Sequence, residues 1–176
     1  PEVSVTRTLR TYGVPEDMVH RTLAGLTASQ EPKVSIQKEG GEVLVQVTGR
    51  GPKPAQAAAA CTPVLRRAVE LLGDAAYGLD VESLQAAVVE KVQKKDLGLA
   101  IAESGSGGML TRVLGETRNG AEVLRYTVAV DTDRAKWEKL GISYRMVKKH
   151  GGCSEQAAVF LADAARRKSE AEIGVA

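Results

Sequence analysis

Apolar and polar residues alternate along the first part of the chain in a pattern that predicts strands separated by helices. The alternation over Val3–Arg10 is typical of a half-buried strand. Pro15, followed by two acidic residues, predicts a helix that continues to about residue 26 with apolar side chains on one face. Two further alternating runs, 32–37 and 42–48, are separated by Lys-Glu-Gly-Gly and predict a hairpin.

An alanine-rich helical segment follows between residues 52 and 72 and ends at Gly73. Pro63 falls inside this pattern, and we expect a kink or a false start there because proline cannot donate a helical hydrogen bond. Together with the first strand and the hairpin, this helix makes residues 1–78 a small α/β module.

The second part of the chain alternates strands with helices. The elements predicted in it are a helix over 81–95, a strand over 97–101, a helix that begins at 109–110, a strand over 123–130, a helix over 154–168 and a strand over 172–176. This order is typical of an α/β domain with a largely parallel sheet, which we place at residues 79–176. Because the chain begins with Pro rather than Met and ends inside a predicted strand, we expect a piece of a longer protein.

Composition narrows the class of protein. The chain of 176 residues is 43% hydrophobic but only 3% aromatic, so Ala, Val, Leu and Ile must fill its core. A net charge of +2 argues against a general binder of polyanions, and we do not expect nucleic acid as a partner. The sequence contains no apolar run of about 18 residues, so we expect a soluble protein without a membrane partner.

Cysteine and histidine content constrains the compartment and the metal chemistry. Cys61 and Cys153 lie far apart and no secretory signal precedes them, so we expect free thiols in a reducing cytoplasm. His20 and His150 are too few and too separated for a histidine-rich metal centre. We expect His150 to end a helix and Cys153 to be a small buried residue.

A glycine-rich turn, Glu103-Ser104-Gly105-Ser106-Gly107-Gly108, is the clearest local motif, because it leads from a predicted strand into a predicted helix. Backbone N–H groups in such a turn can bind a phosphate. An ordinary strand-to-helix turn with positive φ angles explains the same glycines. Lys136 is a second candidate as a catalytic base, although a solvated lysine on a helix face is the favoured interpretation. A plain connecting loop is the favoured interpretation of Gly49-Arg50-Gly51-Pro52, rather than a nucleic-acid clamp.

Several motifs of the second part resemble the C-terminal domain of the competence/damage-inducible CinA family, which also occurs as a stand-alone nicotinamide-nucleotide amidase. The family's A-E-S-C-T-G-G stands here as Ala102–Gly108. Its N-E-A-K, L-G-V, H-G-A-V-S-E and A-D-I-G-I-A motifs resemble residues 133–136, 139–142, 150–155 and 171–176. The first part is similar to the KH-like middle module of the family. The resemblance implies a KH-like α/β module followed by a three-layer α/β domain with a largely parallel sheet.

The resemblance also implies a reaction, the hydrolysis of the nicotinamide amide of nicotinamide mononucleotide to the nicotinate nucleotide and ammonia. The family is thought to use a serine nucleophile activated by a lysine and assisted by a tyrosine, with neither metal nor cofactor. Alignment places the lysine at Lys136, the serine at Ala121 and the tyrosine at Asp131. The nucleotide or its phosphate is expected at Glu103, Ser104, Gly105, Ser106, Gly107 and Gly108.

Alanine has no oxygen with which to attack a carbonyl, and no serine lies between Gly108 and Lys136. We therefore predict a catalytically degenerate relative that retains nucleotide binding and forms a homo-oligomer, a dimer as is common in the family. One alternative is an active amidase whose nucleophile is Ser106 or a threonine. Another is a nucleic-acid-binding module of the KH type.

Overall fold

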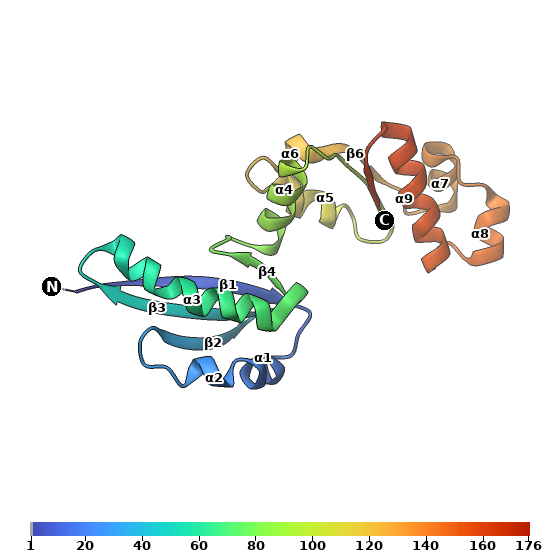
Figure 1. The fold of residues 1–176 in the computed structure, drawn as a ribbon. Coiled ribbons are helices and arrows are strands. Elements are labelled where there is room, and N and C mark those ends of the chain that lie inside the picture. Colours follow the sequence, from blue (N-terminus) through green and yellow to red (C-terminus); the bar gives the residue numbers. More distant parts are fainter. Residues whose placement is uncertain (1) are drawn as a thin grey trace. The chain divides into compact units, whose positions relative to one another are not determined.

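The protein has the predicted mixed α/β fold, as a computed structural model describing residues 2–176 shows (Figure 1). Its internal contacts divide the chain into two units, Pro1–Leu84 and Gln85–Ala176. Each unit has its own sheet, with four strands in the first and three in the second.

The first unit is built around an antiparallel sheet in the order β2-β3-β1-β4. Its elements are β1 (Val3–Tyr12), α1 (Glu16–Thr22), α2 (Ala24–Thr27), β2 (Lys33–Glu39), β3 (Glu42–Gly51), α3 (Pro54–Leu72), the short 3-10 turn η1 (Gly73–Ala75) and β4 (Ala76–Leu79). The predicted hairpin is confirmed as the β2–β3 pair, in which Glu39 lies opposite Glu42.

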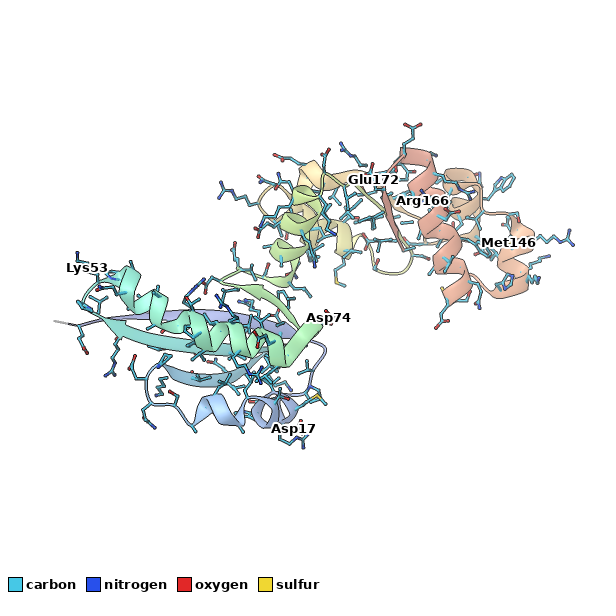
Figure 2. All side chains as sticks on the ribbon, viewed as in Figure 1. Asp17, Lys53, Asp74, Met146, Arg166 and Glu172 are labelled. Carbon is cyan, nitrogen blue, oxygen red and sulfur yellow. The ribbon has the colours of Figure 1, made fainter. Side chains whose placement is uncertain are left out.

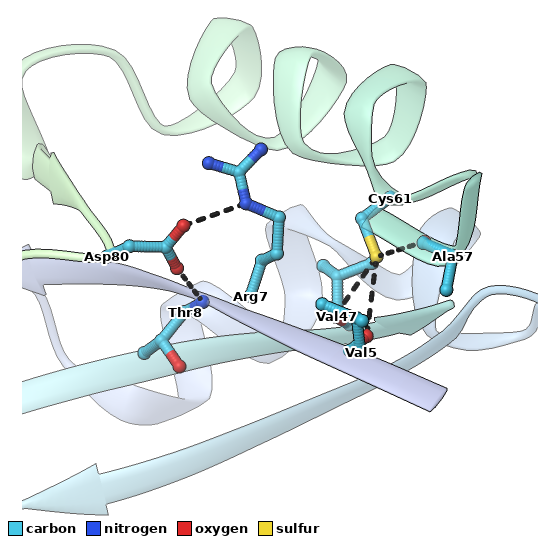
Figure 3. Close-up of polar contacts among 7 residues, drawn as sticks. All are labelled: Val5, Arg7, Thr8, Val47, Ala57, Cys61 and Asp80. Atoms are coloured by element: carbon cyan, nitrogen blue, oxygen red, sulfur yellow. Dashed lines mark hydrogen bonds and ion pairs between the residues drawn. The ribbon is translucent and has the colours of Figure 1, made fainter. Parts of the chain in front are cut away.

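The core of the first unit lies on the face of the sheet that α3 covers. Leu9 on β1 and Val45 on β3 are almost fully buried and pack with Leu65 on α3. The thiol of Cys61 points from α3 to backbone carbonyls of the sheet, with its Sγ 3.4 Å from the oxygen of Val47 (Figure 3). The apolar residues that alternate along the strands therefore lie on the buried face of the sheet, as the sequence predicts.

The carboxylate of Asp80 helps to tie the chain that leaves β4 back to β1. Asp80 accepts a hydrogen bond from the Arg7 Nε at 2.7 Å and another from the backbone N–H of Thr8 at 2.8 Å (Figure 3). Asp80 has a φ of 54°, so the backbone turns sharply where the sheet ends. This contact fixes the exit of the chain from the first unit.

Two details of the first unit differ from the sequence predictions. α3 runs without a break from residue 54 to 72, so Pro63 does not mark a false start. Gly49 and Gly51 belong to β3 rather than to a connecting loop, because both pair with β1. The first three residues of the segment Gly49-Arg50-Gly51-Pro52 are therefore part of the sheet.

Gly49 allows α3 to pack directly against β3, and an alanine there is expected to destabilise the first unit. An added Cβ would lie 2.4 Å from the carbonyl oxygen of Ala57, a backbone atom that cannot move alone. We expect Gly49→Ala to lower the free energy of unfolding by about 2 kcal/mol in a urea titration. Gly25→Ala is the control, since its Cβ would meet no atom within 4 Å. Equal stabilities of the two variants would refute the close packing.

The second unit contains a parallel sheet in the order β6-β5-β7. Its elements are α4 (Leu84–Lys94), β5 (Leu99–Glu103), α5 (Met109–Gly115), α6 (Gly120–Val123), β6 (Leu124–Ala129), α7 (Asp133–Leu140), α8 (Tyr144–His150), α9 (Glu155–Ser169) and β7 (Ile173–Val175). The parallel sheet of the sequence prediction is confirmed, and its central strand β5 is buried along its whole length.

Two separate apolar clusters cover the two faces of β5, which makes this unit three-layered. Leu99 and Ile101 pack on one face with residues of α4, α5 and α6. Ala100 and Ala102 pack on the other face with Leu161 and other residues of α9. Because successive side chains of a strand point to opposite faces, a fully apolar strand is what a sheet covered on both sides requires.

Candidate functional site

The glycine-rich turn and Asp131 come together where β5 and β6 end. Parallel strands place their carboxyl ends at the same edge of a sheet, which is the usual ligand-binding edge of α/β folds. Here the N–H of Val130 donates to the carbonyl oxygen of Glu103 at 2.8 Å. The N–H of Gly105 donates to Oδ1 of Asp131 at 2.7 Å. Asp131, at the position aligned with the tyrosine, therefore ties the glycine-rich turn to the end of β6.

Glu103 fills the amino end of α5 with its own carboxylate. It is 6% exposed and accepts hydrogen bonds from Ser106 Oγ at 2.6 Å and from the N–H groups of Leu110 and Thr111, each at 2.9 Å. The residue that precedes α5 is Gly108, which has no side chain with which to cap the helix. Glu103 thus provides the cap from the end of the preceding strand.

These contacts set the charge of Glu103. Burial raises the pKa of this carboxyl. The hydrogen bonds from Ser106, Thr111 and Leu110 together lower the pKa by more than burial raises it, and the resulting pKa is about 2. Glu103 is therefore a carboxylate at neutral pH. Its carboxylate occupies the N–H groups of Leu110 and Thr111, which a phosphate would otherwise use, and the expected contact between Glu103 and a nucleotide stays a prediction.

The rest of the turn has the conformation that the sequence predicts. Gly105, Gly107 and Gly108 have φ angles of 85°, 62° and 82°, which side chains rarely adopt. A Cβ added to any of the three would meet no heavy atom within 4 Å, so open space lies against the turn. The backbone between Ser104 and Gly108 can therefore be approached closely from outside.

Lys136 is buried in α7, contrary to the favoured interpretation of a solvated lysine. Its side chain is 3% exposed, and its Nζ lies 3.6 Å from Oδ1 of Asp133. The Nζ also donates to the carbonyl oxygen of Gly152 at 2.8 Å. Lys136 thus connects α7 to the loop between α8 and α9, and no contact joins it to the glycine-rich turn within residues 2–176.

Ala121 lies at the opposite end of β6 from the other aligned positions. It belongs to α6, which precedes the strand, whereas Asp131 and Lys136 follow it. Six residues of strand span about 20 Å. Within one chain, the position aligned with the nucleophile is therefore remote from the position aligned with the base.

Around the Gly151–Gly152 loop, one of the two sequence predictions is confirmed. His150 is the last residue of α8, and Ser154 caps α9 by accepting a hydrogen bond from the N–H of Ala157 at 3.1 Å. Cys153 is exposed rather than buried. The prediction was wrong because the residue lies in the loop between the two helices and not on a packed helix face.

The two thiols are expected to differ strongly in reactivity. Cys61 is fully buried, which raises the pKa of its thiol, whereas Cys153 is exposed. With a chromogenic disulfide reagent, we expect one thiol to react quickly in the native protein and the other at least about a hundredfold more slowly. Cys153→Ser should remove the fast phase and Cys61→Ser should keep it. Two equally fast phases would contradict the burial of Cys61.

The geometry defines a class of protein, a small antiparallel α/β module joined to a three-layer α/β domain with a candidate binding turn at the carboxyl edge of its sheet. Comparison with known protein families shows which family has this arrangement. The CinA C-terminal domain matches residues 81–176, and the KH domain of damage-inducible protein CinA matches residues 6–78. The chain belongs to the CinA family.

Known proteins with similar sequences carry the same description. A CinA-like protein of Desulfovibrio desulfuricans is 31% identical over 167 residues, which are 95% of this chain and 39% of that protein. One from Kosmotoga olearia is 26% identical over 98% of this chain and 42% of its own length. A CinA superfamily protein from Escherichia coli of known structure is 27% identical, with a TM-score of 0.49 over 51% of this chain and 52% of that one. The chain thus spans about two fifths of the length of these two CinA-like relatives.

Residues 2–176 contain no group of three or more His, Cys, Asp or Glu side chains arranged to hold a metal ion. Within the same residues, no helix is both long and apolar enough to cross a bilayer.

Proposed function

We propose that this chain binds nicotinamide mononucleotide or a related nucleotide without hydrolysing its amide. The observation that carries the proposal is the alanine at position 121, where the family resemblance expects the serine nucleophile. Loss of a nucleophile removes several orders of magnitude of rate, because the acyl intermediate cannot form.

The surroundings of Lys136 support the same conclusion. A lysine that activates a serine must lie within hydrogen-bonding distance of the hydroxyl. Instead, the Nζ of Lys136 contacts the oxygen atoms of Gly152 and Asp133. In the proposed function Lys136 fixes the loop after α8 and does not take part in acyl transfer.

Ser106 is a poor substitute nucleophile in this arrangement. Its hydroxyl donates to Glu103, whose pKa is about 2. A carboxylate this acidic is a weak base at neutral pH and cannot remove the serine proton effectively. This argues against the alternative of an active amidase that uses Ser106.

Nucleotide binding is proposed at the open side of the glycine-rich turn. The backbone of Gly105 and Gly107 faces open space, and the phosphate of the nucleotide would lie there rather than at the donors that Glu103 occupies. We further propose that the protein acts in the cytoplasm as a homodimer. Its exposed thiol, Cys153, would stay reduced there.

Calorimetric titration with nicotinamide mononucleotide tests the binding part of the proposal. We expect measurable binding that Gly107→Ala weakens at least about tenfold, because a Cβ at φ 62° strains the turn and fills the space next to it. The control is Gly73→Ala, also at a positive φ with open space, in the first unit. Absence of binding to the unchanged protein, or equal binding by both variants, would refute the proposed site.

A further inference from the structure

Basic residues are concentrated in one short stretch of the second unit. The net charge of the whole chain is only +2, yet residues 139–154 contain four lysine or arginine residues and no acidic one. Three of the four, Arg145, Lys148 and Lys149, lie on α8. A nearly neutral protein therefore carries a local positive patch, and its total charge does not describe this surface.

The three cations and one aromatic side chain share a single face of α8. Residues at positions i, i+1, i+4 and i+5 of a helix fall within one arc, and Tyr144, Arg145, Lys148 and Lys149 have this spacing. These four residues, which we call the α8 patch, line a surface hollow of about 750 Å³. The other side of the helix packs inward, with Val147 buried. Nitrogen-tipped side chains extend away from α8, on which Met146 is labelled in Figure 2.

The cations of the α8 patch are not neutralised by the protein. Of the ion pairs present in residues 2–176, none involves Arg145, Lys148 or Lys149. The basic pair on α9 behaves differently, since Arg166 and Arg167 both contact Asp163. Three unpaired cations on a helix of seven residues repel one another, and an anionic ligand would relieve this repulsion.

We propose that the α8 patch binds single-stranded nucleic acid. Lysine and arginine neutralise phosphates, and an exposed aromatic ring stacks on an unpaired base. Tyr144 is 53% exposed and supplies this ring beside the three cations. A membrane surface fits less well, because the exposed arc of α8 carries no aliphatic side chain that could enter a bilayer.

The charge part of this proposal predicts a specific salt dependence. Three phosphate contacts on a single strand give a slope of about −2 for the logarithm of the binding constant against the logarithm of salt concentration. We would measure fluorescence anisotropy of labelled oligothymidylate and oligouridylate over a range of salt concentrations. Lys148→Ala/Lys149→Ala should reduce the slope to about −0.7 and weaken binding at least about tenfold at low salt.

A matched variant distinguishes the effect of the α8 patch on binding from the effect of the total charge of the protein. Arg166→Ala/Arg167→Ala removes the same number of positive charges from the same unit, but from residues that are paired with Asp163. We expect its affinity to stay within about twofold of the unchanged protein. Equal losses in the two double variants, or no binding of either oligonucleotide at low salt, would overturn the proposal.

The aromatic part is tested at Tyr144. Stacking of one base contributes about 1–3 kcal/mol, so Tyr144→Ala should weaken oligonucleotide binding at least about fivefold while Tyr144→Phe retains it. If Tyr144→Ala binds normally and inorganic polyphosphate competes as well as the oligonucleotide, the patch is a general anion site. If vesicles with phosphatidylserine bind and oligonucleotides do not, it is a membrane site. Either result overturns the proposal, and neither depends on whether the protein binds nicotinamide mononucleotide.

Discussion

Replacement of Glu103 by alanine is expected to lower the free energy of unfolding of the second unit by about 3 kcal/mol at pH 7. The carboxyl has a pKa of about 2 in the folded protein against an ordinary value of 4.5, so the fold stabilises its charged form by roughly 3 kcal/mol, and alanine loses this stabilisation. The physical cause is the loss of the side chain that caps α5, which leaves the part-buried N–H groups of Leu110 and Thr111 without their acceptor.

The same residue makes stability depend on acid pH. Because folding lowers the pKa of Glu103, its contribution is present in full above about pH 4.5 and is lost as the pH falls toward 2. Chemical denaturation measured across this range should show a smaller decline for Glu103→Gln than for the unchanged protein.

Glu172→Gln provides the control for the stability of the second unit. Glu172 also accepts a backbone hydrogen bond, from Gly98 at 2.6 Å, but it is exposed to solvent. We expect a far smaller loss from Glu172→Gln than from Glu103→Gln. Similar losses in the two variants would show that the buried cap of α5 has no special importance.

Lys136→Met is the second substitution for which a large effect is expected. Methionine keeps most of the buried volume but cannot donate to the carbonyl of Gly152 or pair with Asp133. Hydrogen bonds from charged groups contribute about 1.5–3 kcal/mol, so we expect a loss of about 2 kcal/mol in the free energy of unfolding. Amide hydrogen exchange should also become faster in the loop between α8 and α9.

Lys139→Met is the control, and it tests whether the loss of any lysine from α7 has the same effect on stability. Lys139 also donates to a backbone carbonyl, that of Ala129 at 3.0 Å, but its side chain is exposed. We expect it to change stability by less than about 1 kcal/mol. A catalytic base need not stabilise the fold, so unchanged stability in Lys136→Met would contradict the structural role that we assign to Lys136.

The sequence predicts best those elements in which a regular pattern of apolar residues extends over many positions. The hairpin β2–β3, the long helices α3 and α9, and the buried strand β5 all follow from alternation or helical spacing in the sequence. The short helices α7 and α8 were not predicted as complete elements. Each has seven or eight residues, mostly polar, and only its capping residue, Thr132 or Ser143, marks the start.

The contacts of the candidate site were less predictable, because they join side chains to distant backbone atoms. The Nζ of buried Lys136 donates to the carbonyl oxygen of Gly152, sixteen residues later. Every residue has a backbone carbonyl, so the sequence does not indicate which one accepts this hydrogen bond. Glu103 caps a helix that begins six residues later, whereas caps normally come from the adjacent residue. The glycine-rich turn was predicted, but the occupation of its helix donors by Glu103 was not.

The proposed absence of amide hydrolysis can be tested directly with isotopic water. Hydrolysis of nicotinamide mononucleotide in water enriched in oxygen-18 transfers the label to the carboxylate of the nicotinate nucleotide, which mass spectrometry detects. We predict no labelled product above a blank without protein, even at high protein concentration, because position 121 is alanine. Labelled product that increases with protein concentration and disappears in Lys136→Ala would contradict our account and restore Lys136 as a catalytic base.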